Sequence, residues 1–444
     1  MGTGASRGVL KATHAIAAGD DAHTTNPWHV SLAAAIGSFI EYYDFGVYGV
    51  MALTLGPLFF VGQTPATALL SALLVYASAF VIRPLGAIVF GWMGDKHGRR
   101  NTLIVTVVGM GTASALIGVL PTYATAGVAA PALLVLLRLV QGFFAGGEVS
   151  GAATYVAECA PEGRRGFFGS INVAGVIAGG AGAAFTAAIV RTIASPEGLA
   201  SWGWRLPFFV SLPLLVIGLY ARLRLADSPR FEEVVQHREV ARAPLLQVIE
   251  HHAGALAQTI GLAFGMTVTG LFSSVYLLIY IIQVAKLPQA WASWTFACVE
   301  CVAVMVTPLV GLLSDRVGRK PPVVVGLIGY MILVPLAMVV MRTQSLPAAS
   351  LMLLLLALPH AGVQGAVYPI YPELFPTRVR YTGMAFGFNI AIIAGGGLAP
   401  WVSTKLVELF ENPIAGSLYV VIGSLVALAT LATVRDSSRV PLAD

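Results

Sequence analysis

Acidic side chains lie inside an apolar stretch near the start of this sequence, where they could bind a solute or carry a proton. Glu41, Asp44 and Tyr48 are spaced by three and four residues, which places them on one face of a helix. A charge at the centre of a lipid bilayer costs about 2.5–3.5 kcal/mol on insertion scales. Each such group therefore needs a partner, a proton or a water-filled cavity.

Other apolar stretches carry ionisable or strongly polar groups as well. They are Arg83, then Arg138 with Gln141 and Glu148, and finally Glu300. Four acids against two arginines leave two surplus carboxylates, so we expect at least one acid to hold a proton. Glu300 has no evident basic partner in its half of the chain and is the best protonation candidate there. A purely structural reading stays open, in which Arg138 pairs with Glu148, or Arg83 with Asp44, and locks helices together.

Aromatic and amide side chains in the second half of the chain could line a path for a solute. Tyr276 and Tyr280 offer both a π-face for a cation and a hydroxyl group. Asn389 is a further polar group in an apolar stretch. His360 is another titratable residue there, although a packed, hydrogen-bonded histidine is the commoner case. We predict that the tyrosines and the asparagine face a cavity.

Two short charged sequences each occur twice. Gly94-Asp95-Lys96-His97-Gly98-Arg99-Arg100 recurs about 220 residues later as Ser314-Asp315-Arg316-Val317-Gly318-Arg319-Lys320. Glu158 and Arg165 likewise recur as Glu373 and Arg380. Each copy sits in a short loop between long apolar runs. Such a repeat indicates two duplicated halves, which in a membrane chain favours a transporter.

A charge cluster confined to one membrane face would stabilise closure on that face and would have to break for the face to open. Loops that only set the topology are the alternative. The gate residues that we predict are Gly94, Asp95, Gly98, Arg99, Arg100, Glu158, Arg165, Asp315, Gly318, Arg319, Lys320, Glu373 and Arg380.

The composition is that of a membrane protein. Of 444 residues, 57% are apolar and 11% are charged, against about 25% charged in an ordinary soluble domain. The mean hydropathy is +0.81. Apolar runs long enough to cross a bilayer predict an all-α fold with twelve transmembrane helices, at residues 31–56, 68–92, 102–121, 131–156, 166–191, 204–222, 255–284, 290–313, 322–341, 349–371, 382–404 and 414–434.

The basic residues predict the orientation of these helices. Most of the 26 Lys and Arg fall in the tails and in the loops after even-numbered spans, so that side is cytoplasmic and holds both termini. The net charge of +5 reflects this asymmetry and needs no nucleic-acid partner. The predicted division is a cytoplasmic tail at 1–27, a six-helix bundle at 28–222, a central cytoplasmic loop at 223–250, a second six-helix bundle at 251–434 and a tail at 435–444.

Several of these motifs resemble the major facilitator superfamily over essentially the whole chain. The 94–100 loop is similar to its signature between helices 2 and 3, and 314–320 to the weaker copy between helices 8 and 9. More narrowly, the chain resembles the metabolite:proton symporters, which include carriers of α-ketoglutarate, citrate, shikimate and proline or glycine betaine. The sequences that carry this narrower resemblance are Glu41-Tyr-Tyr-Asp-Phe45, Arg83-Pro-Leu-Gly86, Gln141-Gly-Phe-Phe-Ala-Gly-Gly-Glu148, Trp202-Gly-Trp-Arg-Leu-Pro-Phe208 and Glu373-Leu-Phe-Pro-Thr377. Arg138-Leu-Val-Gln141-Gly142 resembles the helix 4 motif of the superfamily as a whole.

The resemblance implies two pseudo-symmetric six-helix bundles, alternating access and proton-driven uptake across a bacterial inner membrane. It also implies a part for Arg138 in proton coupling. Two departures stand out: position 42 is Tyr where the family usually has Trp, and Glu300 belongs to no pattern of the family.

Together these observations predict a proton-coupled symporter for a small carboxylate-bearing or zwitterionic metabolite. The arginines would bind the carboxylate of the solute. The acidic residues would bind a proton or the cationic group of the solute. The expected partners are the solute, protons and the lipid bilayer, with the protein acting as a monomer and the proton as coupling ion in place of any cofactor or metal. An efflux antiporter of the same fold is the alternative. A non-transporting receptor, or an enzyme without an evident nucleophile–base or metal-ligand set, is less favoured.

Overall fold

The computed structural model describes residues 26–97, 99–223, 244–377, 379–436 and 442, and its regular elements there are helices. The first half contains α2 (Pro27–Phe59), α3 (Pro65–Val81), α4 (Arg83–His97), α5 (Arg99–Val119), α6 (Tyr123–Ala126), α7 (Ala129–Ala145), α8 (Glu148–Cys159), α9 (Arg165–Ile193), α10 (Pro196–Ser201), the 3₁₀ turn η1 (Gly203–Arg205), α11 (Leu206–Phe209) and α12 (Ser211–Leu223).

The second half repeats this plan. It contains α14 (Pro244–His251), α15 (Ala253–Leu271), η2 (Phe272–Tyr276), α16 (Leu277–Gln283), α17 (Gln289–Val317), α18 (Lys320–Met341), α19 (Leu346–Val367), α20 (Ile370–Glu373), α21 (Arg380–Ile392), η3 (Ile393–Gly397), α22 (Ala399–Phe410) and α23 (Ser417–Thr433). Helix α14 overlaps the end of the range predicted as a loop, 223–250, and its Val248 is fully buried against Phe375 and Val379.

Hydroxyl and amide side chains start several of these helices next to a proline. The Asn26 carboxamide accepts a hydrogen bond from the Trp28 amide at 3.0 Å, and Pro27 opens α2. Thr64 caps α3 in the same way, directly before Pro65. Such residues satisfy amides that have no partner within the helix, and proline needs none. The sequence thus sets where these membrane helices begin.

Nine helical segments in the described residues are long and apolar enough to cross a bilayer: Pro65–Met93, Thr102–Val119, Arg165–Ile193, Gly203–Tyr220, Ala253–Gln283, Gln289–Val317, Lys320–Met341, Leu346–Glu373 and Arg380–Phe410. Two shorter apolar helices, α7 and α23, and the long α2 with its two acids complete a set of twelve. Each corresponds to one predicted span.

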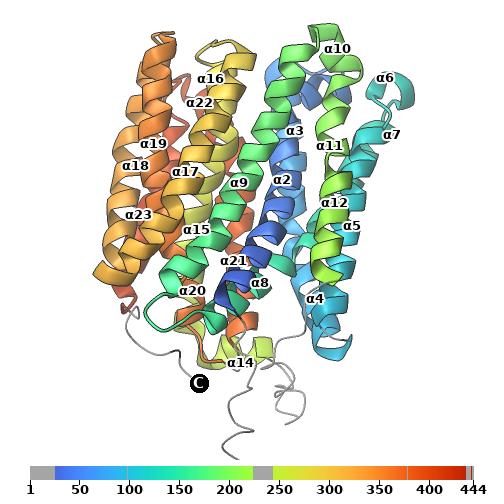
Figure 1. The fold of residues 1–444 in the computed structure, drawn as a ribbon. Coiled ribbons are helices and arrows are strands. Elements are labelled where there is room, and N and C mark those ends of the chain that lie inside the picture. The colour runs from blue at the N-terminus through green and yellow to red at the C-terminus, as the bar shows by residue number, and fades with distance from the viewer. Residues whose placement is uncertain (1–25, 98, 224–243, 378, 437–441, 443–444) are drawn as a thin grey trace, which may run out of the picture.

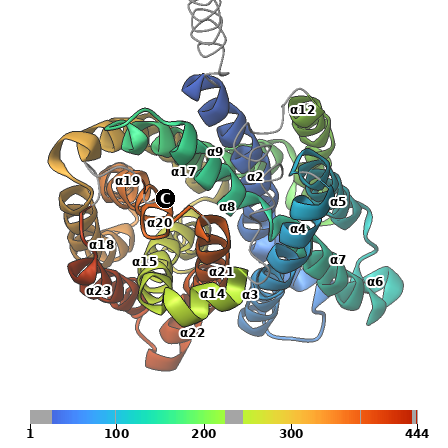
Figure 2. The same cartoon turned by 90° about the horizontal axis from the view of Figure 1, so that it is seen from below.

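The two halves stand side by side with their helices roughly parallel (Figure 1). Seen along the helices, α2 to α12 form one bundle and α15 to α23 the other (Figure 2). Helix α9 packs against α2 in its own half and against α17 in the other half. The interface between the halves therefore runs along these long central helices.

Helix α17 has one exposed apolar face and one buried face that carries polar residues. Met305 and Leu309, four residues apart, are 64% and 63% exposed on its outer face. Glu300 and Thr307 are buried on the inner face. Large exposed apolar side chains are what a hydrocarbon environment requires. Glu300 and Thr307, in the middle of the helix, are therefore directed into the protein.

Two membrane segments are interrupted by a wide π-helical turn. The turn η2 separates α15 from α16, and η3 separates α21 from α22. Such turns release backbone groups from the regular helical pattern and are common at functional sites. Both interrupted segments contribute to the cavity described below.

Helices α3 and α7 cross at Gly142. A Cβ atom at this position would collide with the backbone carbonyl of Ala79. Because the obstacle is backbone, neither helix can yield by moving a side chain. Small residues allow such close approach between membrane helices.

We therefore expect Gly142→Ala to destabilise the folded protein by about 1–3 kcal/mol through overpacking. Thermal unfolding in detergent, followed by scanning fluorimetry, measures the effect. Gly254→Ala is the matched control, because its Cβ would meet nothing within 4 Å. Equal melting temperatures for the two variants would contradict the tight crossing.

Candidate functional site: a central cavity and a cytoplasmic gate

A cavity lies between the two halves at the level of the wide turn η2. Its open space, mouth included, amounts to about 690 Å³. Both halves contribute to its wall, which contains aromatic rings, a few hydroxyl and amide groups, and one carboxylate. The lining residues are Tyr42, Phe45, Gly46, Tyr76, Val176, Ile177, Gly180, Met266, Thr267, Gly270, Leu271, Ser274, Val275, Glu300, His360, Gln364, Tyr368, Phe388 and Ile392.

Two arginines are buried behind the aromatic wall of the first half. Arg83 forms an ion pair with Glu41, and its guanidinium lies 5.1 Å from the centre of the Phe45 ring and 5.6 Å from that of Phe80. It also donates to the Ala145 carbonyl at 3.3 Å. Cation–π contact and an ion pair together compensate a charge that water does not reach.

Arg138 is held in a similar aromatic cage. Its guanidinium lies 4.5 Å from the centre of the Tyr48 ring, 5.1 Å from that of Phe45 and 5.4 Å from that of Tyr76. It donates to the Tyr76 carbonyl at 3.1 Å and to the side chain of Gln141. Phe45 and Tyr76 therefore separate this charge from the cavity.

Hydrogen bonds continue from Arg138 to Ser114, and Asp44 has a hydroxyl partner of its own. Gln141 donates to the Ser114 hydroxyl at 2.6 Å. The Asp44 carboxylate accepts from the Ser211 hydroxyl. The first set of bonds links α7 to α5, and the second links α2 to α12.

These contacts differ from the ion pairs that the sequence left open. Arg83 pairs with Glu41 and not with Asp44, while the side-chain partner of Arg138 is the neutral Gln141. Glu148 is buried at the start of α8. The spacing in α2 places Glu41 and Asp44 on one face, but it does not show which of the two acids pairs with Arg83 at the start of α4.

The polar groups of the second half form a separate cluster. The Tyr330 hydroxyl lies 2.7 Å from Nδ1 of His360 and 3.0 Å from the Ser273 hydroxyl. Glu300 and His360 both line the cavity, and Gln364 is fixed there by donating to the Met266 carbonyl at 3.2 Å. Three helices and the turn η2 therefore position this cluster.

The structure does not place the two predicted tyrosines in the cavity wall. Tyr280 donates to the Met338 carbonyl at 2.7 Å, and Tyr276 packs between Phe272 and Tyr280. Asn389 donates to the Gly146 carbonyl at 3.2 Å, across the interface between the halves. All three side chains are buried in contacts with the protein. A polar residue in an apolar stretch of sequence can be packed in this way or can face a solute, and the sequence does not distinguish the two.

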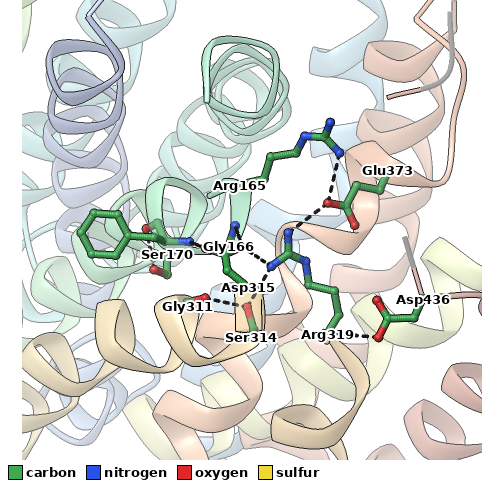
Figure 3. Close-up of polar contacts among 10 residues, drawn as sticks. Arg165, Gly166, Ser170, Gly311, Ser314, Asp315, Arg319, Glu373 and Asp436 are labelled. Atoms are coloured by element: carbon green, nitrogen blue, oxygen red, sulfur yellow. Dashed lines mark hydrogen bonds and ion pairs between the residues drawn. The ribbon is translucent and has the colours of Figure 1, made fainter. Parts of the chain in front are cut away.

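The repeated motif of the second half joins the two halves at one end of the molecule, the end that the basic loops predict to be cytoplasmic (Figure 3). The two carboxylate oxygens of Asp315, on α17, accept from the amides of Gly166 and Phe167 at 2.8 and 2.9 Å. These amides belong to the first turn of α9, where backbone donors and the helix dipole favour an anion. An acid from one half thus caps a helix of the other half.

Arg319 holds this cap in place. It donates to Asp315 at 2.6 Å, to Ser314 at 3.0 Å and to Glu373 at 3.2 Å, while Arg165 lies 3.8 Å from Glu373 (Figure 3). Burial alone would lower the pKa of Arg319, but Glu373 and Asp315 raise that pKa above its ordinary value. This guanidinium therefore stays charged at any physiological pH.

The duplicated Glu and Arg residues pair crosswise between the halves. Glu158 of the first half accepts from Arg380 of the second at 3.2 Å, and Glu373 of the second half pairs with Arg165 of the first. Arg380 is fixed further by the Pro372 and Phe375 carbonyls at 2.9 and 3.2 Å. Both copies of the motif therefore contribute to ion pairs across the interface, and Glu373 is shared between Arg165 and Arg319.

Several predicted gate residues lie outside what the structure describes. They are Gly98, the surroundings of Gly94, and the side chains of Asp95, Arg99 and Arg100. In the second copy, Gly318 makes the turn between α17 and α18 with a φ of 95°, and Lys320 begins α18.

Sequence reasoning missed two parts of this arrangement. Asp436, in the C-terminal tail, accepts from the Arg319 amide at 3.1 Å (Figure 3). At the opposite end of α9, Arg191 donates to the Ser293 hydroxyl of the other half at 2.6 Å, and Trp294 donates to Thr192 at 3.0 Å. Arg191 was visible in the sequence only as one of few basic residues on the non-cytoplasmic side.

Comparison with known proteins gives a consistent picture. The sugar (and other) transporter family profile matches residues 30–255 and 243–443. A glycine betaine/proline/ectoine/pipecolic acid transporter of Dickeya dadantii is 35% identical over 92% of this chain and 83% of its own length. The shikimate transporter of Escherichia coli is 33% identical over 91% of this chain and 95% of its own.

Solved structures share the fold at lower identity. A crystal structure of a D-xylose–proton symporter covers 92% of this chain and 98% of its own, with a TM-score of 0.73 and 21% identity. The Escherichia coli xylose transporter in a partially occluded, inward-open state gives a TM-score of 0.73 with 20% identity, over 93% of this chain and 98% of its own. The predicted all-α arrangement of two six-helix bundles is thereby confirmed.

The crosswise pairs imply that linking Glu158 to Arg380 would hold the cytoplasmic end closed. We expect the double variant Glu158→Cys/Arg380→Cys, in a background without Cys159, Cys298 and Cys301, to lose transport when a bifunctional methanethiosulfonate is added, which links the two cysteines through disulfide bonds. Reducing agent should restore it, because closure alone blocks the cycle. Solute uptake into proteoliposomes is the measurement, and each single cysteine variant is the control. Full transport by the cross-linked double variant would disprove a gate at this position.

Proposed function

Because this chain belongs to the sugar (and other) transporter family of the major facilitator superfamily, we propose that it is a symporter that takes up a small carboxylate-bearing or zwitterionic solute together with a proton. The family is one of membrane transporters and not of enzymes, as the sequence predicted. Solute and proton would use the central cavity in turn from the two sides of the membrane.

The surroundings of Asp44 carry this proposal. A carboxylate buried in the membrane interior needs compensation, and here one oxygen accepts from the Ser211 hydroxyl while Oδ2 has no hydrogen-bond partner among the described residues. Phe45, the next residue, lines the cavity. Asp44 therefore has an oxygen available to take up a proton close to the bound solute.

The electrostatics of the first half suit a carboxylate-bearing solute. Arg138 has a neutral side-chain partner in Gln141, so its positive charge acts on the cavity through Phe45 and Tyr76. The names of the relatives fit this: one carries shikimate, and others carry proline, betaine or ectoine. We extend these solute classes to the present chain.

The contacts at the two ends of the molecule support alternating access. The cytoplasmic end is joined by ion pairs and by the Asp315 cap, and the opposite end by Arg191 with Ser293 and Trp294 with Thr192. Each set joins the two halves, so one set must break for the cavity to open on its side. We place the protein in a bacterial inner membrane, with both termini inside the cell and the monomer as the working unit.

Replacing Asp44 by Asn tests the proton step. The amide keeps the size of the side chain but cannot take up a proton, so we expect the accumulation ratio under a proton gradient to fall to about one while counterflow exchange of solute persists. Both are measured in proteoliposomes with radiolabelled solute. The exposed Glu197, changed to Gln, is the control and should accumulate solute like the wild type.

Undiminished accumulation by Asp44→Asn would remove this residue from the coupling mechanism. Outward movement of solute against inward movement of protons in the wild type would instead identify an efflux antiporter, and the proposed uptake would be wrong.

A further inference from the structure

Glu300 is the one carboxylate among the described residues that line the cavity. It lies midway along α17, is 5% exposed and faces the same space as the aromatic rings of the first half. Within the part of the chain that the structure describes, its carboxylate forms no hydrogen bond and no ion pair. By contrast, Glu41 binds Arg83 and Asp44 binds Ser211.

A carboxylate at this depth must be neutralised by a proton or by a cation. The described residues of the cavity wall include neither Lys nor Arg. The nearest polar cluster is already engaged, since Tyr330 is bonded to both His360 and Ser273. The described residues of the cavity wall therefore supply no fixed positive charge to Glu300.

The rest of the wall favours a cation as the missing partner. Tyr42, Phe45 and Tyr76 from the first half, with Tyr368 and Phe388 from the second, present π-systems to the same space. Aromatic faces attract organic cations, and the attraction grows when water is excluded. A carboxylate next to several rings is the usual composition of a site for an alkylated ammonium group.

We propose that Glu300 binds a positively charged group of the transported solute, so that the solute is a zwitterion or cation with an ammonium or quaternary ammonium group. The solute would then span the cavity, with its cationic end at Glu300 in the second half and any carboxylate toward Arg138, behind Phe45 and Tyr76. This inference rests on the proposed function, because it takes the central cavity as the solute site.

The test uses glycine betaine and its carbon isostere 3,3-dimethylbutanoate, which has the same shape and carboxylate but no positive charge. Purified wild-type protein should bind betaine more tightly, as measured by isothermal titration calorimetry. We expect Glu300→Gln to weaken betaine binding by about 10- to 100-fold and to leave binding of the isostere unchanged. Proline, which is also a zwitterion, and the cation choline serve as further probes with a positively charged nitrogen.

Two controls separate this effect from a folding defect or from a general loss of charge. Glu408→Gln makes the same change at an exposed residue paired with Lys405 and should bind all probes like the wild type. The melting temperature of Glu300→Gln in detergent should stay close to that of the wild type, because glutamine has the size of glutamate.

Three results would overturn the inference. One is a wild type that binds none of the cationic probes, and another is equal affinity for betaine and the isostere. The third is a Glu300→Gln variant that binds betaine normally but no longer accumulates it under a proton gradient, since Glu300 would then carry the proton instead. In each of these cases, proton-driven uptake of a monocarboxylate would still support the proposed symport. Preferential binding of betaine without proton-coupled uptake would instead support the cation site at Glu300 and contradict the proposed symport.

Discussion

The cost of placing a charge in hydrocarbon is the constraint on which the rest of this structure depends. Each ionisable side chain in the membrane interior must meet a partner, a ring or the cavity, and the helices are arranged so that this happens. Arg83 and Arg138 are enclosed by aromatic rings of α2 and α3. Arg83 also pairs with the Glu41 carboxylate, and Arg138 donates to the Gln141 amide. The outer faces meanwhile carry exposed Leu, Ile, Val and Met. A polar interior inside an apolar exterior is therefore both what holds the bundles together and what provides a site.

Duplication explains how the two halves are joined at the end that carries the repeated motifs. Two copies of one loop motif place an acid and an arginine at equivalent points of each half, and the copies pair crosswise, Glu158 with Arg380 and Glu373 with Arg165. The Asp315 cap on α9 adds a helix terminus to the same interface. The opposite end lacks such a repeat in the sequence, and the described contacts there are single hydrogen bonds to neutral groups. The two ends of the cavity are thus held by different chemistry.

Much of this could be predicted from the sequence, because hydropathy, basic loops and repeats are local signals. The twelve spans, the family and the two-bundle fold are confirmed. Contacts between helices are not local. Spacing put Glu41 and Asp44 on one face without deciding which of them meets Arg83, and Ser114 and Ser211 resembled ordinary small residues of membrane helices. Tyr276 and Tyr280 met the requirements for a solute wall as well as for core packing, and the structure places them in the core.

The ion pairs of the gate are nearly as buried as the arginines of the membrane interior, and this bears on how the gate works. Arg319 and Glu373 are each 1% exposed, Arg380 is fully buried and Glu158 is 12% exposed. For pairs this deep, the loss of hydration offsets much of the Coulomb attraction, so the closed state gains little net free energy from them. Opening exposes the same charges to water, which recovers the hydration and compensates the broken pairs. In the closed state, such ion pairs fix how the two halves are positioned relative to each other, because a misplaced charge would stay unpaired. Opening them nevertheless requires only a modest change in free energy. An apolar seal of similar area would have to expose its surface without any such compensation.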